Sequence, residues 1–250
     1  MIKIDKVYKS FATNSVLRGV SMEIADGSLV AVVGPSGTGK SVLLKLITSL
    51  LEVDSGVISI DDHVVTDNKW SVESQYVAEK MGVLFQGAAL FDSMTLLENV
   101  TFPLIERNKL SSKDIQEKSL AYLWDVGLKG YEDKLPGEIS IGMRKRVGVA
   151  RALVTDPEYL FFDEPNTGLD PEVGQEIYEL IARMHARFKF TGIVISHEIP
   201  EIFQICKRVI MLYNGLVQVD GSVDEFLSCD NPVVQHFIRG SADGPIQLNF

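Results

Sequence analysis

The octapeptide GPSGTGKS, Gly34 to Ser41, combines glycines, a lysine and hydroxyl residues at a spacing that suits phosphate chemistry. It follows the apolar run LVAVV and precedes the helix-like run VLLKLITSLL. The glycines let successive backbone N–H groups point inward at phosphate oxygens, and the helix start adds partial positive charge. We expect Lys40 to reach the β- and γ-phosphates and Ser41 to ligate Mg²⁺. The alternative is a Gly-rich turn without a ligand.

A second group of chemically useful residues stands in YLFFDEP, where four apolar residues precede Asp163 and Glu164. An acid after a buried strand holds Mg²⁺, usually through water, in proteins with such a phosphate loop. We expect Asp163 to take that role and Glu164 to accept a proton from an attacking water. The alternative is a pair of acids that cap a strand end.

The elements that must position these residues follow from periodicity. Residues Val173, Ile177, Ile181, Met184 and Phe188 recur at three- and four-residue spacing, which is one helix face. Helical patterns of this kind lie between several short β-rich runs, at 2–8, 16–24, 28–33, 57–60, 82–85, 159–162, 192–196 and 207–213. This alternation predicts an α/β fold with a mainly parallel sheet and an antiparallel β part near the N-terminus.

Two further features concern domain organisation. The helix-rich stretch 88–156, with helices expected at 95–107, 112–126 and 142–155, predicts a helical subdomain inserted into an α/β core of 1–87 and 157–240. Asn214-Gly215 predicts a hairpin turn, because both residues tolerate positive φ. Residues 241–250 carry Gly, Asp and Pro and predict an extended tail.

Composition limits the class of protein. The chain has 250 residues, 46% of them hydrophobic, and a net charge of −10. An acidic balance argues against nucleic acid as the main partner, because duplex binding depends on a basic face. The apolar runs are far shorter than the ~18 residues of a membrane span, and MIKIDKVYKS has no signal-like apolar segment. Cys206 and Cys229 match no metal spacing and favour a reducing compartment.

Taken together, GPSGTGKS, ISIGM, FFDEPNTGLDP and the SH at 196–197 occur in the order found in ATP-binding subunits of ABC transporters, which the chain resembles over about residues 1–240. The resemblance implies a P-loop ATPase domain that binds ATP and Mg²⁺. It also implies that ATP contacts the whole loop and the residue after it, namely Gly34, Pro35, Ser36, Gly37, Thr38, Gly39, Lys40, Ser41 and Val42.

The same resemblance assigns roles to four single residues. Phe11 matches an aromatic that stacks on adenine, and Gln86 matches a Mg²⁺-sensing glutamine at the junction with the membrane subunit. His197 matches a switch residue that hydrogen-bonds the γ-phosphate, and Asp170 matches an aspartate that links two sites across a dimer. The alternatives are a core aromatic for Phe11, a solvated loop residue for Gln86 and a structural histidine for His197.

The segment ISIGM resembles the family's LSGGQ, which closes over ATP held by a second subunit. Ser140 is a good N-cap, and Gly142 allows close backbone approach to a γ-phosphate. Ile141 replaces a Gly, and Met143 replaces the Gln of a capping box, so that box is lost. We expect these two departures to affect closure of the dimer and not ATP binding. The alternative is a plain capped helix.

Three stretches point to a transporter class. ALFDSMTLLENVTFPL, MRKRVGVARAL and SADGPI resemble the Mla-type subunits that energise phospholipid traffic between bacterial membranes, in systems with an MCE-domain lipid-binding protein. This resemblance implies a homodimer bound through a permease to the cytoplasmic face of the inner membrane. An ATPase for amino acids or another solute, a nucleic-acid-handling ABC ATPase and a regulatory module without turnover are the alternatives.

Overall fold

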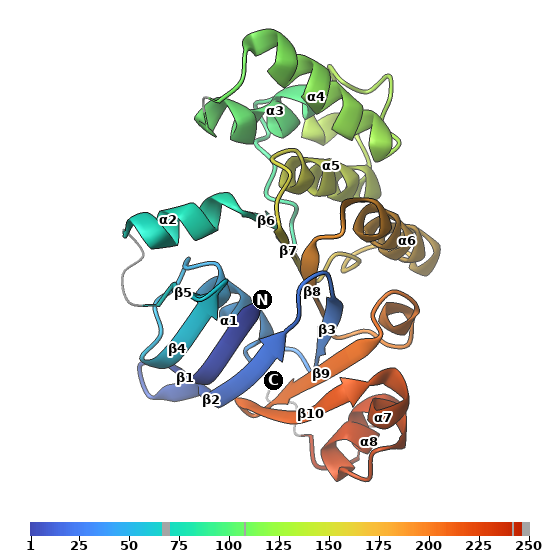
Figure 1. Cartoon of the computed structure of the whole chain (residues 1–250). Coiled ribbons are helices and arrows are strands. Elements are labelled where there is room, and N and C mark those ends of the chain that lie inside the picture. Colours follow the sequence, from blue (N-terminus) through green and yellow to red (C-terminus); the bar gives the residue numbers. More distant parts are fainter. Residues whose placement is uncertain (67–70, 108, 242, 247–250) are drawn as a thin grey trace. The chain divides into compact units, whose positions relative to one another are not determined.

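The computed structural model describes residues 1–66, 71–107, 109–241 and 243–246 (Figure 1). The chain divides into two compact units. The first unit consists of Met1–Glu79 with Ile193–Phe250, and the second unit consists of Lys80–Gly192.

An antiparallel sheet forms the N-terminal part of the first unit. Its strand order is β2-β1-β4-β5 (Figure 1). Ile2 pairs with Ile24 on one side and with Ile60 on the other, and all three side chains are fully buried. Apolar residues that alternate along a strand place one face of the sheet in the core. The strands are β1 Ile2–Phe11, β2 Asn14–Ile24, β4 Ser55–Ile60 and β5 His63–Val64.

The first unit also contains the buried strand that leads to the phosphate loop. This strand, β3 (Leu29–Val33), pairs in parallel with β9 (Arg208–Tyr213), and β9 pairs antiparallel with β10 (Leu216–Ser222). Asn214 and Gly215 join β9 to β10 with positive φ at both positions, which confirms the predicted hairpin. The helices are α1 Lys40–Ile47, α2 Val72–Glu79, η2 Glu201–Gln204, α7 Val223–Ser228 and α8 Pro232–Arg239.

Two short parallel strands and four α-helices make up most of the second unit. Strand β6 (Met81–Leu84) pairs with β7 (Tyr159–Asp163), and helix α5 packs on β6 (Figure 1). Strand β8 (Thr191–Ser196) begins in this unit and continues into the first, where it neighbours β3. The helices are α3 Leu96–Arg107, α4 Ser112–Asp125, η1 Pro136–Glu138, α5 Ile141–Leu153 and α6 Pro171–Phe188.

These elements confirm the predicted α/β class with an antiparallel N-terminal part. The three helices expected between 95 and 155 are present as α3, α4 and α5, each within two residues of the predicted ends. The predicted elements did not include α2, α7 and α8, which have eight, six and eight residues, because such short helices offer few turns over which periodicity can be recognised. The division into a core of 1–87 and 157–240 and a subdomain of 88–156 stays a prediction.

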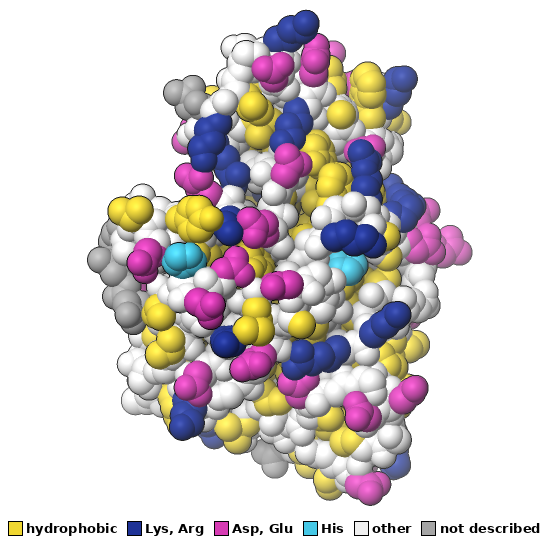
Figure 2. Space-filling view, viewed as in Figure 1, with side chains coloured by type: hydrophobic (Ala, Val, Ile, Leu, Met, Phe, Trp, Pro, Cys, Tyr) yellow, Lys and Arg dark blue, Asp and Glu magenta, His cyan; other side chains and the backbone are white. Residues whose placement is uncertain are grey.

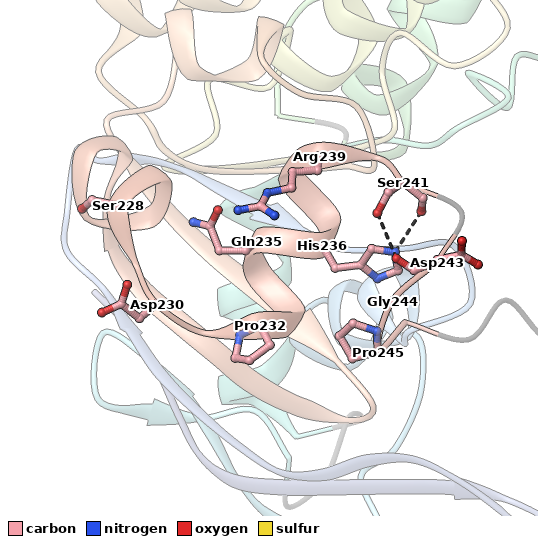
Figure 3. Close-up of a pocket in the computed structure, with 10 residues that line it drawn as sticks. All are labelled: Ser228, Asp230, Pro232, Gln235, His236, Arg239, Ser241, Asp243, Gly244 and Pro245. Atoms are coloured by element: carbon pink, nitrogen blue, oxygen red, sulfur yellow. Dashed lines mark hydrogen bonds between the residues drawn. The ribbon is translucent and has the colours of Figure 1, made fainter.

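The described residues of the C-terminal segment lie against α8. Ile246 donates its backbone N–H to Nδ1 of His236 at 3.1 Å. Nε2 of His236 lies 2.8 Å from the carbonyl oxygen of Ser241 (Figure 3). Both bonds form when His236 is neutral with its proton on Nε2. A polar cavity of about 620 Å³ opens between this segment and α8. The description of 241–250 as an extended tail stays a prediction.

Among the helices in the described ranges, none combines the length and the apolar character that crossing a bilayer requires.

Replacement of Gly82 by Ala should destabilise the second unit. A Cβ at Gly82 would lie 2.3 Å from the carbonyl oxygen of Ala152 on α5, so α5 and β6 must move apart. Overpacking of this kind costs about 1–3 kcal/mol. Chemical denaturation should show the loss, whereas Gly87→Ala, where a Cβ meets no atom within 4 Å, should leave stability nearly unchanged. Equal stability of the two variants would contradict this packing.

Candidate active site

The phosphate loop of the first unit has a backbone that only glycines adopt without strain. Gly34, Gly37 and Gly39 have φ of 147°, 79° and 96°. A Cβ at Gly34 would lie 2.2 Å from the carbonyl oxygen of Leu212 on β9, and a Cβ at Gly39 would lie 2.9 Å from side-chain atoms of Val16 and Leu17. The loop therefore fits closely between β9 and β2, and its shape depends on the glycines that the sequence supplies.

Helix α1 begins at this loop without a side-chain cap. Its N-cap is Gly39, which makes no side-chain hydrogen bond, and its first turn contains no acidic residue. The first N–H groups of a helix have no intrahelical partner, and they carry the positive end of the helix dipole. The start of α1 is therefore suited to an anion such as a phosphate. Ser41 and Val42 are the second and third residues of this helix.

Lys40 is held beside the loop. Its side chain is 4% exposed, and Nζ donates hydrogen bonds of 2.8 Å to the carbonyl oxygens of both Gly34 and Pro35. Thr38 donates its hydroxyl to the carbonyl oxygen of Pro35 at 2.9 Å. A buried ammonium needs such partners, because an unpaired charge is costly away from water. The loop thus positions one positive charge next to the N–H groups of α1.

Phe11 and His197 are the other predicted residues of the first unit. Phe11 ends β1 and is 45% exposed, so its ring is available for stacking and is not a core aromatic. Lys9 places Nζ 5.5 Å from the centre of that ring. His197 follows β8, and its Nε2 lies 3.8 Å from a carboxylate oxygen of Glu198. The proposed contact of each residue with nucleotide stays a prediction.

In the second unit, parallel pairing brings Gln86 and Glu164 together. Leu84 of β6 pairs with Phe162 of β7, and Gln86 and Glu164 each follow two residues later. Gln86 donates its side-chain amide N–H to Oε2 of Glu164 at 3.0 Å. Thr167 donates its hydroxyl to the same oxygen at 3.1 Å, which orients the carboxylate from a second side. Glu164 has φ of 48°, a conformation that non-glycine residues rarely adopt and that is frequent at functional sites.

The acids after β7 lie beside a buried cation that the sequence reading did not select. Lys145 of α5 is 2% exposed, and its Nζ donates to the carbonyl oxygens of Gln86 and Glu164. Burial lowers the pKa of Lys145, while the charges of Glu164 and Asp163 act to raise it. Asp163 itself is 6% exposed. The positive charge of Lys145 therefore partly balances the negative charges of Asp163 and Glu164 within the second unit.

Helix α5 begins as the sequence suggests. Ser140 is its N-cap and accepts a hydrogen bond from the backbone N–H of Met143 at 3.2 Å. Ile141 is 53% exposed at the first helical position. A Cβ at Gly142 would lie 2.7 Å from Val173 of α6, so this glycine also serves helix packing. Asp170 is the N-cap of α6, and its carboxylate makes no capping hydrogen bond.

The predicted Mg²⁺ ligands carry the kinds of oxygen donor that suit this cation. Ser41, Gln86 and Asp163 supply a hydroxyl, an amide oxygen and a carboxylate, which are ligands that this hard cation prefers. Within the described residues, no group of three or more His, Cys, Asp or Glu side chains is arranged to hold a metal alone. The assignment of Ser41, Gln86 and Asp163 as Mg²⁺ ligands stays a prediction.

A glycine-bearing loop between a buried strand and a helix, with an acid after another buried strand, defines a P-loop ATPase domain. Residues 17–167 match the family model described as ABC transporter, which is more than half of the chain. The chain belongs to the ABC transporter family.

Relatives of known name agree with this assignment. The Arabidopsis thaliana chloroplast protein TRIGALACTOSYLDIACYLGLYCEROL 3 is 39% identical, over 99% of this chain and 76% of its own length. The probable ribonucleotide transport ATP-binding protein mkl of Mycobacterium leprae is 38% identical, over 99% and 71%. The intermembrane phospholipid transport system ATP-binding protein MlaF of Haemophilus influenzae is 34% identical, over 92% and 87%.

Solved structures agree as well. A dimeric ATP-binding cassette in a post-hydrolysis state, bound to ADP and Pi, superimposes with a TM-score of 0.81 and 29% identity, over 89% of this chain and 99% of that chain. Together these findings confirm that the chain is an ATP-binding subunit of an ABC transporter and an ATPase.

Three residues at the site or at the loop after Gln86 were not predicted, namely Thr167, Lys145 and Arg151, the last of which donates to the carbonyl oxygens of Ala88 and Ala89. Thr167 stands in FFDEPNTGLDP, three residues after Glu164. A hydroxyl at this spacing only weakly indicates a contact with the carboxylate. The two basic residues lie in the run MRKRVGVARAL, where sequence alone does not separate buried from solvated cations.

Substitution of Gly39 by Ala should weaken nucleotide binding. The new Cβ would combine an unfavourable φ of 96° with contacts of 2.9 Å to Val16 and Leu17, so the start of α1 must shift. Positive φ alone costs about 1–2 kcal/mol, which corresponds to about tenfold in affinity if it falls on the binding conformation. Titration with a fluorescent ATP analogue measures the loss. Gly130→Ala, with φ of 89° and open space, is the matched control and should bind normally.

Proposed function

We propose that two copies of this chain bind two ATP–Mg²⁺ and hydrolyse them to drive a membrane permease that carries phospholipid or a related lipid. The observation that carries the catalytic part is the hydrogen-bonded pair of Gln86 and Glu164, which stand directly after two parallel strands. Such a pair suits the orientation of a carboxylate toward an attacking water.

In this proposal each residue acts through position and charge. Glu164 accepts the proton of the attacking water, and His197 hydrogen-bonds the γ-phosphate. Lys40 and the start of α1 stabilise the charge that builds on the phosphate oxygens. Mg²⁺ near Ser41, Gln86 and Asp163 would neutralise phosphate charge. Phe11 stacks on the base, which is worth roughly 1–3 kcal/mol and does not by itself select adenine.

The second copy completes each site. We infer that Ser140 and the N-terminus of α5 face the γ-phosphate held by the partner, with Asp170 at the dimer boundary. Three features support this arrangement: the capped but exposed start of α5, the carboxylate of Asp170 that does not cap its own helix, and the dimeric state of the similar cassette. Ile141 occupies space at this surface, so we expect closure to be less tight than with a glycine there.

A groove of the second unit suits the permease. It has a volume of about 370 Å³ and combines apolar walls with two arginines, and its lining includes Phe85, Phe91, Phe102, Pro103, Arg107 and Arg151. Phe91 is 41% exposed and stands 4.9 Å, centre to centre, from the ring of Phe102. An exposed aromatic cluster of this kind is typical of a protein interface. Binding there would hold the chain at the cytoplasmic face of the inner membrane.

The lipid cargo rests on the relatives and on partner-facing stretches, not on the catalytic residues. The names of the Haemophilus and Arabidopsis relatives refer to phospholipid transport and to a glycolipid, whereas the name of the Mycobacterium relative refers to ribonucleotide transport. We therefore propose an Mla-type system with an MCE-domain partner, and an importer of an amino acid or other solute is the second candidate.

Nucleic acid is a less suitable partner. On the face that Figure 2 shows, acidic and basic side chains are interspersed and do not form one broad basic area. The net charge of −10 adds a repulsive term toward phosphate backbones. Salt-sensitive DNA binding by the purified chain would favour the nucleic-acid alternative.

The variant Glu164→Gln tests the catalytic assignment. It keeps the shape of the side chain and removes the proton acceptor, so ATP should still bind while turnover falls by at least about a hundredfold, the lower range of general-base effects. Phosphate release measures turnover, and size-exclusion chromatography with ATP should show accumulation of an ATP-bound dimer. Undiminished ATPase activity would remove Glu164 from this role.

Gentle co-purification from membranes tests the partner and the cargo. Mass spectrometry should detect an integral permease together with bound phospholipid. Phe91→Arg in the groove should lose the permease, because a charge enters an apolar contact, whereas Tyr131→Arg, at a site 42% exposed outside the groove lining, should retain it. Recovery of an amino-acid-binding protein in place of lipid would overturn the proposed cargo.

A further inference from the structure

The basic residues of α5 have unequal surroundings. Arg144, Lys145, Arg146 and Arg151 all lie on this helix, yet Lys145 is 2% exposed. Lysine is almost never fully buried unless its ammonium is paired or hydrogen-bonded, because burial of the charge is costly. The location of Lys145 therefore needs a specific explanation, and its hydrogen bonds provide one.

Lys145 joins the two segments that carry the catalytic pair. Its Nζ donates to the carbonyl oxygen of Gln86 after β6 and to the carbonyl oxygen of Glu164 after β7, the second at 3.3 Å. The side chains of these two residues are themselves hydrogen-bonded at 3.0 Å. One cation thus holds the backbone on both sides of the contact that orients the Glu164 carboxylate.

Arg151 fixes the next part of the same loop. Its guanidinium donates to the carbonyl oxygens of Ala88 at 2.5 Å and Ala89 at 2.7 Å. Ala88 and Ala89 have φ of 60° and 47°, a conformation that residues with a Cβ rarely adopt. Adjacent strained residues persist where their surroundings hold them. Helix α5 therefore holds the loop Gln86–Ala89 at both ends through cations.

We propose that Lys145 is a positioning residue for ATP hydrolysis, and that with Arg151 it fixes the loop Gln86–Ala89 to α5 so that Gln86 meets Glu164. The N-cap of α5, Ser140, lies five residues before Lys145, or about 7.5 Å along a rigid helix. A displacement of the start of α5 would then move the carbonyls that Lys145 holds. This inference rests on the proposed roles of Gln86 and Glu164.

Arg146 provides a matched control on the same helix. It is the neighbour of Lys145, and it also donates to a backbone carbonyl, that of Val126, at 3.2 Å. Its other partner is Glu176 of α6, at 2.7 Å. Neither partner belongs to the loop Gln86–Ala89 or to the segment after β7. Replacement of Arg146 should therefore remove a contact between α5 and backbone, as replacement of Lys145 does, but should leave the loop Gln86–Ala89 in place.

The first experiment compares steady-state ATPase kinetics of the full chain with Lys145→Met and Arg146→Met. For Lys145→Met we expect kcat to fall at least about tenfold while KM for ATP stays within about twofold, because the loop after β6 shifts and the phosphate loop does not. Arg146→Met should keep the kcat of the unmodified chain when the samples are compared at equal concentrations of folded protein, which thermal melting checks. Unchanged kcat in folded Lys145→Met would overturn the proposal.

A double-mutant cycle with Gln86→Ala separates positioning from general support. If Lys145 acts through Gln86, the double variant should be little slower than Gln86→Ala alone. If Lys145 only supports the fold, the fold-changes in kcat of the two single variants should multiply in the double variant. That result would overturn the proposal. Lys145→Gln, whose shorter side chain keeps an amide donor but carries no charge, should give a smaller loss with the same non-additivity. That variant decides the test if Lys145→Met does not fold.

Glu164→Gln in the same assay keeps the two hypotheses apart. If Glu164→Gln abolishes turnover and Lys145→Met does not, only the positioning role fails. If Glu164→Gln retains turnover, the proposed catalytic base fails whatever the lysine variants show.

Discussion

Burial of charge is the constraint on which this molecule depends. In the described ranges, three residues that are charged at neutral pH are buried, namely Lys40, Lys145 and Asp163. A buried charge is tolerated where hydrogen bonds or opposite charges replace water. Lys40 binds carbonyls of the phosphate loop, and Lys145 binds carbonyls next to the acids. Each buried cation thus fixes a segment of backbone that bears functional groups.

Because of this constraint, the basic residues of α5 do not simply form a basic surface. Lys145 and Arg151 hold carbonyl oxygens of one loop, and Arg146 holds a carbonyl near the end of α4. The helix uses its cations to organise protein backbone, while its N-terminus, capped by Ser140, remains at the surface. In the proposed dimer, one helix would therefore contact the partner's phosphate at its start and the chain's own catalytic pair farther along.

The proposed cargo rests on features outside the catalytic residues. The hydrogen bonds around Glu164 suit ATP hydrolysis in a transporter of any cargo, since function within a shared fold is set by the site and its partners. The names of the Haemophilus and Arabidopsis relatives favour lipid transport, and the groove beside Phe91 is the proposed permease surface. The proposed cargo and the proposed chemistry therefore rest on different parts of the chain.

The sequence by itself determined the features that are local along the chain. Gly34 to Ser41 lie in one continuous segment after a buried strand, and the turn at Asn214 needs only two residues that tolerate positive φ. The N-cap at Ser140 is equally local, because its partner Met143 is three residues away. Contacts of this range are encoded in residue type and spacing, so a linear pattern is sufficient to predict them.

Only the tertiary structure decided which distant residues meet. Gln86 and Glu164 are 78 positions apart, and they meet because Leu84 pairs with Phe162 in the parallel register of β6 and β7. Lys145 reaches Gln86 across 59 positions because α5 packs on β6. Register and helix packing depend on the whole core, which no local pattern contains. For that reason the sequence suggested Gln86 and Glu164 as site residues but gave no sign that Lys145 binds their carbonyl oxygens.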